Sequence, residues 1–235
     1  MSARTPEPSG THLAAGLEPK PVDVMPVLHL GRLCLDFGRI ERLCKHPDGE
    51  RPETDTDHTV MLGLVGCAFA ARHLPWLDLG LVAQYALVHD LVEVYAGDTP
   101  TLRINDNIRR QKAEYEGAAL NRLRREFGTR LPWVVDTIDA YEDRAQPEAR
   151  YVKALDKLLP KITHIVNRAI VLHEQGMVGP ELAARYAAQL VELHGYAADF
   201  PPLFELRKQL LELLSDVLVP AAPPTRITEQ PSTAA

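Results

Sequence analysis

Tyr85-Ala-Leu-Val-His-Asp-Leu-Val-Glu-Val-Tyr95 is an apolar stretch with helical spacing, and two polar side chains, His89 and Asp90, lie in its middle. Adjacent residues on a helix point about 100° apart, so both can reach a point only between their two faces, where a metal ion could sit. Glu93 follows at helical spacing and places a carboxylate on the same side. The stretch therefore offers two metal ligands and an acid or base, although a core histidine beside a capped or paired aspartate also explains it.

Composition limits the classes of protein that the chain can belong to. It has 235 residues, 46% of them hydrophobic, enough for one substantial domain or two small ones. The formal net charge of -6 argues against a general surface for nucleic acid or anionic membranes. The longest apolar run, Val60 to Ala71, is shorter than the roughly 20 residues that span a bilayer, and no signal pattern precedes it. We expect a soluble, cytoplasmic protein with no membrane or nucleic-acid partner.

The three cysteines do not suggest a disulfide framework or a thiolate zinc site. Cys34, Cys44 and Cys67 are odd in number and contain no Cys-x-x-Cys pair. We expect Cys34 and Cys67 to be small core residues. The ligands of any metal must then be histidine and carboxylate.

The apolar spacing predicts an all-α fold with disordered tails. The expected division is a tail over 1–24, one helical domain over 25–218 and a tail over 219–235, because both ends are rich in proline and small polar residues. Trp133, Ile138 and Tyr141 are expected to reach the core. The expected helices cover 27–43, 58–74, 80–95, 106–126, a segment from Pro132, a segment over 151–174 broken at Pro160, and then 180–194 and 201–217.

His58, at the start of one expected helix, and Asp156, in a later one, can complete a site with His89 and Asp90. Histidine nitrogen and carboxylate oxygen suit a divalent transition metal. Asp156 lies between Leu155 and Leu158, where a carboxylate is costly to bury unless it is paired or metal-bound. A surface ion pair with neighbouring Lys153 or Lys157 is the alternative. The other histidines are expected at loops, helix ends or polar positions: His29, His46, His73, His164, His173 and His194.

The pattern His58, His89-Asp90, Glu93, Gly97-Asp98 and Asp156 resembles the HD-domain metal-dependent phosphohydrolases. The segments Glu53 to His58 and Leu87 to Pro100 are most similar to the 5'-deoxynucleotidase branch, and the resemblance spans about 30–172. It implies a helical bundle in which one divalent ion is held by His58, His89, Asp90 and Asp156. Glu93 would handle protons near the scissile phosphate.

The resemblance also implies residues that bind substrate. Asp98 is either a capping residue after Gly97 or a side chain at the substrate sugar and leaving oxygen. Arg42 best matches the family's phosphate-binding arginine, Arg39 is the alternative, and Arg103 is a further candidate.

Three features of the sequence differ from related branches of the superfamily. Leu43 follows Arg42 where the deoxynucleotidases carry a tryptophan, so a preference for deoxyribose does not follow. No histidine occurs between Leu91 and Leu155, which favours one metal ion over two. Val94 replaces the second acid that is typical of alarmone hydrolases.

The expected function is metal-dependent hydrolysis of nucleoside, and by resemblance deoxynucleoside, 5'-monophosphates by water that the metal activates. One alternative is release of triphosphate from nucleoside triphosphates, and another is a non-catalytic nucleotide or metal sensor. Manganese, cobalt, iron, nickel and zinc all suit the ligands. The expected partners are the nucleotide and, by resemblance, a second copy of the chain.

Overall fold

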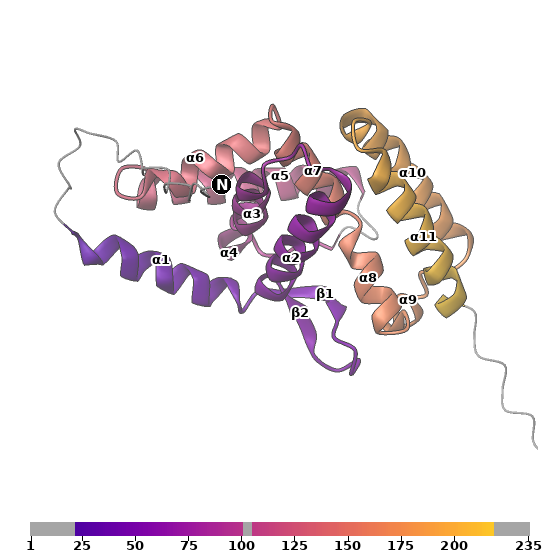
Figure 1. Ribbon diagram of the computed structural model, residues 1–235. Coiled ribbons are helices and arrows are strands. Elements are labelled where there is room, and N and C mark those ends of the chain that lie inside the picture. The colour runs from indigo at the N-terminus through magenta and orange to yellow at the C-terminus, as the bar shows by residue number, and fades with distance from the viewer. Residues whose placement is uncertain (1–21, 101–104, 219–235) are drawn as a thin grey trace, which may run out of the picture.

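The computed structural model describes residues 22–100 and 105–218, and this part of the chain is helical apart from one short β-hairpin (Figure 1). The expected all-α fold is thus confirmed, whereas most of the two tails and Arg103 lie outside the described residues. The elements are α1 (Val24–Phe37), β1 (Glu41–Lys45), β2 (Pro52–Thr54), α2 (Asp55–His73), α3 (Leu79–Val88), α4 (Glu93–Ala96), α5 (Asp106–Phe127), α6 (Pro132–Asp143), α7 (Pro147–Asp156), α8 (Leu159–Val166), α9 (Ile170–Glu174), α10 (Pro180–Ala197) and α11 (Pro201–Leu218).

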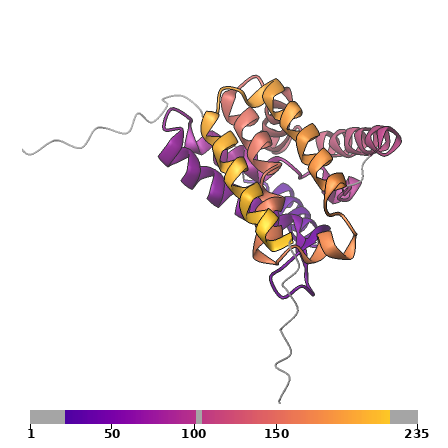
Figure 2. The same ribbon diagram turned by 90° about the vertical axis from the view of Figure 1, so that its right-hand side faces the viewer.

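The core is built around α3, which packs against α2, α6 and α7. A Cβ atom at Gly66 of α2 would be in ordinary van der Waals contact, 3.4 Å from Leu155 of α7 and 3.5 Å from Val82 of α3, so the three helices meet at this position. The Tyr151 hydroxyl donates to the Gly66 carbonyl at 2.8 Å and ties α7 to α2. The α10 and α11 helices lie at one end of the molecule, nearest the viewer in Figure 2. No described helix is long and apolar enough to cross a membrane.

The expected first helix over 27–43 is too long. The α1 helix ends at Phe37, and the Gly38 backbone caps it by donating to carbonyls of the last turn. The chain then forms β1, which pairs antiparallel with β2, with Glu41 opposite Thr54 and Lys45 opposite Pro52. A turn in which the Gly49 amide donates to the His46 carbonyl at 2.9 Å closes this hairpin. Arg42 therefore lies on a strand and not at the end of a helix.

The expected continuous helix over 80–95 is also wrong, because it breaks at the His89-Asp90 pair. The α3 helix ends at Val88, and the backbone then makes tighter bonds, Leu91 N to Val88 O at 3.1 Å and Glu93 N to Asp90 O at 2.8 Å. His89 Nδ1 lies 2.8 Å from the Ala86 carbonyl, which would bond the Asp90 amide in a continuous α-helix. The pair occupies the turn between α3 and α4.

Several expected core positions differ in the structure. Cys34 is exposed and Cys67 partly exposed, whereas Cys44 of β1 is buried. The Trp133 side chain is 47% exposed, although Ile138 and Tyr141 on the same helix are buried. Trp133 lies in the first turn of α6 on its outer side, and Cys44 is buried because it lies on β1 and not in a helix.

Candidate metal centre

His58 is positioned by the capped start of α2. The Thr54 side chain accepts from the Asp57 amide and the Asp57 carboxylate accepts from the Thr54 amide, which forms a capping box. His58 lies in the first turn, with Nδ1 3.0 Å from Glu53 Oε1 and Nε2 2.9 Å from Asp156 Oδ1. Glu53 is held in turn by the Thr163 hydroxyl at 3.0 Å. A carboxylate on Nδ1 orients the ring and aims Nε2 at the cluster, as in many metal sites.

The His89 ring is also oriented by a hydrogen bond at Nδ1, in this case to a backbone carbonyl. Because a carbonyl can only accept, His89 Nδ1 donates to Ala86 O at 2.8 Å, and the lone pair of the neutral ring lies on Nε2. His89 Nε2 is 3.0 Å from Asp90 Oδ2 and 3.9 Å from Asp156 Oδ1. A lone pair that faces two carboxylates needs a proton or a metal ion between them.

The four expected ligands converge on one point. One ligand atom from each of His58, His89, Asp90 and Asp156 lies within 4.8 Å of the other three. Two imidazoles and two carboxylates are a suitable donor set for a divalent transition metal, so the residues fit such an ion. The alternative of a surface ion pair for Asp156 is wrong, because its carboxylate contacts His58 and not the neighbouring lysines.

The charges within this cluster show how strongly it favours a cation. Burial alone raises the pKa of Asp156, but the hydrogen bond to His58 outweighs it and holds that pKa well below its ordinary value. Burial lowers the pKa of His58, but its bonds to Asp156 and Glu53 outweigh burial and raise it to about 9. The cluster therefore retains positive charge between its carboxylates.

Arg42 lies beside the cluster, among four carboxylates. Its Nη1 atom is 2.9 Å from Asp55 Oδ1 and 3.0 Å from Asp90 Oδ2. The same atom is 3.8 Å from Glu93 Oε2 and 4.0 Å from Asp98 Oδ1. Asp55, Asp90 and Glu93 also offer oxygens that lie within 4.8 Å of one another, so the guanidinium contacts a second carboxylate cluster. Burial lowers the pKa of Arg42, but the carboxylates outweigh it and keep the side chain charged.

Glu93, the expected acid or base, is buried at the start of α4. Lys112 of α5 donates to its Oε1 atom at 2.9 Å, whereas Oε2 makes no hydrogen bond to a described residue. Burial and, next, the charge of Asp90 raise the pKa of Glu93 to about 10. A divalent cation in the cluster opposes this shift, because positive charge favours the ionised carboxylate.

Asp98 faces the cavity, which is consistent with the expected contact to a substrate sugar or leaving oxygen. Gly97 ends α4 with a φ of 76° and a ψ of 153°, which lies outside the left-handed helical region, and its amide donates to Glu93 O at 2.7 Å. Asp98 lines the cavity, and burial is the largest of the effects that raise its pKa. Arg39 is not part of this site, because its side chain is 81% exposed and pairs with Asp36.

Three neighbours of the site were not expected from the sequence, and each comes from a different element. Asp55 is fully buried, and we expected at most a helix cap there. Glu53 orients His58, and Lys112 holds Glu93. The acid-rich start Glu53-Thr-Asp-Thr-Asp-His58 signals Glu53 and Asp55, but nothing in the sequence links Lys112 to Glu93.

His164 lies in the last turn of α8, which agrees with its expected place at a helix end, and its side chain is buried. It lies in α8 with 2% of its surface exposed, and its Nε2 atom is 4.0 Å from Cys44 Sγ. Burial lowers the pKa of His164 to about 4 and raises that of Cys44 to about 12. Both side chains are therefore neutral at pH 7.

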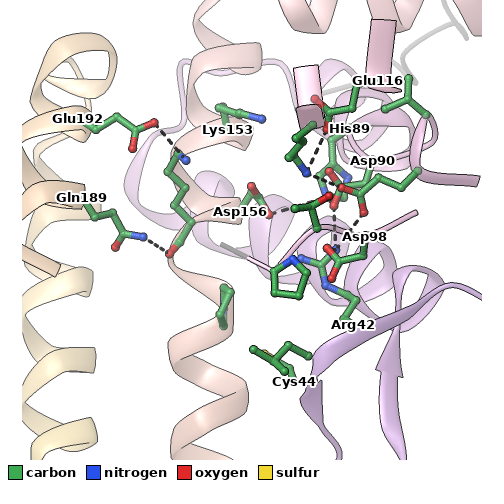
Figure 3. A pocket seen from close by; sticks show the side chains of 18 of the residues that line it. Arg42, Cys44, His89, Asp90, Asp98, Glu116, Lys153, Asp156, Gln189 and Glu192 are labelled. Carbon is green, nitrogen blue, oxygen red and sulfur yellow. Dashed lines mark hydrogen bonds and ion pairs between the residues drawn. The ribbon is translucent and has the colours of Figure 1, made fainter. Parts of the chain in front are cut away.

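A cavity of about 530 Å³ opens from the cluster (Figure 3). On one side it reaches the small or apolar residues Val92, Ala113, Gly117 and Leu120 of the α4–α5 region. On the other side it continues between α7–α8 and α10. The volume is within the range of pockets that bind small organic molecules.

The fold and the site define a class of helical proteins with a paired His-Asp centre suited to a metal ion. Residues 39–190 match the family model of the HD domain, so the chain belongs to the HD domain family. This confirms the superfamily expected from the sequence, while the 5'-deoxynucleotidase branch stays a prediction. Comparison with curated proteins finds no match.

Solved structures show a similar fold. The chain is similar to a predicted metal-dependent phosphohydrolase from Magnetospirillum magnetotacticum MS-1, with a TM-score of 0.68 and 22% identity over 83% of this chain and 93% of that chain. It is also similar to a conserved hypothetical protein from Pyrococcus furiosus, with a TM-score of 0.49 and 20% identity over 79% of this chain and 98% of that chain. The first likeness supports the fold.

Proposed function

We propose that this protein is a metal-dependent phosphohydrolase that releases phosphate from nucleoside 5'-monophosphates. The observation that carries the proposal is the convergence of His58, His89, Asp90 and Asp156 beside Arg42 and Glu93 in one cavity. The structural relative described as a predicted metal-dependent phosphohydrolase supports the class of reaction. The resemblance of Leu87 to Pro100 to the 5'-deoxynucleotidases supports the substrate.

The four clustered side chains would hold one divalent ion. When bound, such an ion supplies Lewis-acid chemistry, because it polarises a phosphoryl oxygen and lowers the pKa of water. Glu53 and the Ala86 carbonyl orient the two imidazoles for this task. Both histidines must offer a lone pair at Nε2 to bind the ion, so His58, whose pKa is raised to about 9, would release a proton when the metal binds.

Arg42 can both fix its own position and bind phosphate. A guanidinium has five N–H donors, and the two on Nη1 face Asp55 and Asp90. Its Nε and Nη2 atoms make no hydrogen bond to described residues, and the side chain lines the cavity. These three donors match the oxygens of a phosphate.

Glu93 is placed to exchange a proton with water or with the leaving oxygen. Lys112 fixes one carboxylate oxygen, which leaves the other free toward Arg42 and Asp98. Asp98 lines the same cavity and suits a contact with a sugar hydroxyl or the leaving oxygen. General acid–base transfer of this kind requires only a carboxyl within hydrogen-bond reach of the reacting atoms.

The test is a product assay on protein loaded with manganese or cobalt. We expect orthophosphate from nucleoside 5'-monophosphates, and we expect His89→Ala and Glu93→Ala to abolish its release. The matched controls His173→Ala and Glu114→Ala change exposed residues and should retain activity. Release of intact triphosphate from nucleoside triphosphates would contradict the monophosphate assignment. Metal binding without turnover of any nucleotide would favour a sensor.

A further inference from the structure

The cavity continues beyond the metal cluster into a basic arm, which is the groove between α7–α8 and α10. Lys153, Lys157 and Lys161 line it from α7–α8, and Arg185 lines it from α10. The three lysines are four residues apart, so they lie on one side of the helical path. Figure 3 shows Lys153 and Asp156 on one wall and Gln189 and Glu192 on the facing wall.

The basic arm holds more positive charge than its own carboxylates neutralise. Lys157 Nζ lies 3.2 Å from Glu192 Oε1. Among the described residues, the ion pairs do not include Lys153 or Arg185, and Lys153 Nζ lies 5.5 Å from the centre of the Tyr141 ring. Glu142 also lines the cavity. Burial lowers the pKa of Lys153, whereas Asp156, Asp90 and, to a smaller extent, Glu142 raise it. Unpaired cations that face a cavity are suited to an anionic ligand.

Lys161 forms the fixed floor of the basic arm. Its buried ammonium donates to the Lys157 carbonyl at 2.9 Å and to Gln189 Oε1 at 2.6 Å. It also lies 4.6 Å from the centre of the Tyr186 ring. Burial and, next, the charge of Arg207 lower the pKa of Lys161 to about 7, so an anionic ligand would favour its ammonium form, whose third donor is free for that ligand. The position of this charge is set by α8 and α10 before any ligand binds.

The two arms of the cavity differ in chemistry. The arm beside α4 and α5 has small or apolar side chains at Val92, Ala113, Gly117 and Leu120, and its charged residues Lys112 and Glu116 pair with each other at 3.1 Å. A neutral ring system suits the arm beside α4 and α5. The same ring system in the basic arm would leave its cations without an anionic partner. Lys153, Lys157 and Arg185 face Glu142 and Glu192 in the basic arm, and Asp156 of the metal cluster also acts on Lys153. Burial lowers the pKa of Lys161 to about 7, so this amine adds a partial positive charge, and the remaining excess of positive charge suits a phosphate.

We propose that the substrate carries a second phosphate group, which binds to Lys153, Lys157 and Arg185 while the scissile phosphate lies at the His-Asp cluster. This inference rests on the proposed phosphohydrolase function. Asp156 of the cluster and Lys157 of the basic arm are neighbours in sequence, so one small molecule can reach both. The substrate class is a nucleotide with two separate phosphate groups.

The experiment compares a nucleoside 3',5'-bisphosphate with the 5'-monophosphate of the same nucleoside. We expect kcat/KM of the manganese-loaded protein to be at least about tenfold higher for the bisphosphate, the effect of one charge-assisted hydrogen bond. Lys153→Ala and Arg185→Ala should each reduce this ratio severalfold. The exposed control Arg125→Ala should leave the ratio unchanged, and thermal melting of each variant checks its folding.

The outcomes separate this inference from the proposed function. Equal kcat/KM for the two nucleotides, or a ratio that neither substitution changes, overturns the second-phosphate site and leaves the phosphohydrolase intact. Absence of phosphate release from every nucleotide overturns the proposed function. Calorimetric titration of the metal-loaded protein then decides the inference, because tighter binding of the bisphosphate supports the basic arm and equal binding overturns it.

Discussion

Arg42 shows how a single residue can satisfy a cluster of carboxylates. Asp55 and Glu93 are each buried and each retain one oxygen without a hydrogen bond to the described residues. Removal of one partner from such a group leaves buried like charges unopposed, which is more costly than the pair is stabilising. Arg42 Nη1 lies 2.9 Å from the other oxygen of Asp55, Oδ1, and 3.8 Å from Glu93 Oε2.

Replacement of Arg42 should therefore change both activity and metal content. We expect Arg42→Ala to lower phosphate release by about 100-fold, since it removes a fixed positive donor at the phosphate. We also expect the variant to bind a second manganese ion, because the oxygens of Asp55, Asp90 and Glu93 lie within 4.8 Å of one another. Equilibrium dialysis with elemental analysis measures the stoichiometry. Arg42→Lys and the exposed control Arg39→Ala should stay at one ion, and one ion in Arg42→Ala would refute the role of Arg42.

His164 should make the protein sensitive to acid. Burial and then the charge of Lys161 lower its pKa to about 4, while Glu53 opposes them; Cys44 faces it as a neutral thiol. Between about pH 6.5 and 4 the unfolded chain binds a proton at this residue and the folded chain does not, so acid favours unfolding. The loss begins near pH 6.5 and reaches at most about 3 kcal/mol near pH 4.

Denaturation at pH 7 and pH 4.5 tests this prediction. His164→Leu should lose less stability between the two pH values than the unchanged protein, because it has no group to protonate. The exposed control His173→Leu should behave as the unchanged protein does. An identical loss in His164→Leu would show that other groups cause the acid sensitivity.

The sequence predicted which ligand-type residues come together, but not the residues that support them. His58, His89, Asp90 and Asp156 do converge, although their role as metal ligands stays a prediction. Their residue types and order along the chain carry that information. The pairing of Lys112 with Glu93 depends on how α5 packs on α4, which is a tertiary contact that no local spacing encodes.

At the scale of elements, helix positions were more predictable than helix ends. Period-3.6 spacing continues through Val88, Leu91, Val92 and Tyr95, so the apolar pattern gives no sign of the break between α3 and α4. The break depends on the His89 side chain, which occupies the Ala86 carbonyl. The hairpin was missed for a related reason, since β1 is only five residues long and is stabilised by pairing with β2.

The N-terminal cap of α2 should link helix stability to the metal centre. Thr54→Ala removes the side-chain acceptor of the Asp57 amide, so we expect a loss of about 1 kcal/mol. Because His58 lies in the same turn, we also expect metal affinity to fall by about tenfold. Calorimetry and chemical denaturation measure the two effects. The control Asn105→Ala removes the cap of α5 and should lower stability without a change in metal affinity; a similar change in both variants would contradict the link.

At the scale of the whole molecule, the cluster joins three parts of the core. His58 comes from α2, His89 and Asp90 from the turn after α3, and Asp156 from the end of α7. These elements pack on one another around α3. A ligand shared by all of them is bound by the folded chain alone, because unfolding separates its donors.

Metal binding should therefore stabilise the entire fold. At a free manganese concentration about 100 times Kd, mass action predicts a gain of about 2.7 kcal/mol in the free energy of unfolding. Thermal melting with added manganese and then with a chelator measures a rise in Tm and its reversal. Asp156→Asn should lose this rise, because it removes the charged oxygen that the α7 end contributes. The exposed control Asp139→Asn on α6 should keep the rise, and an equal rise in Asp156→Asn would place the ion elsewhere.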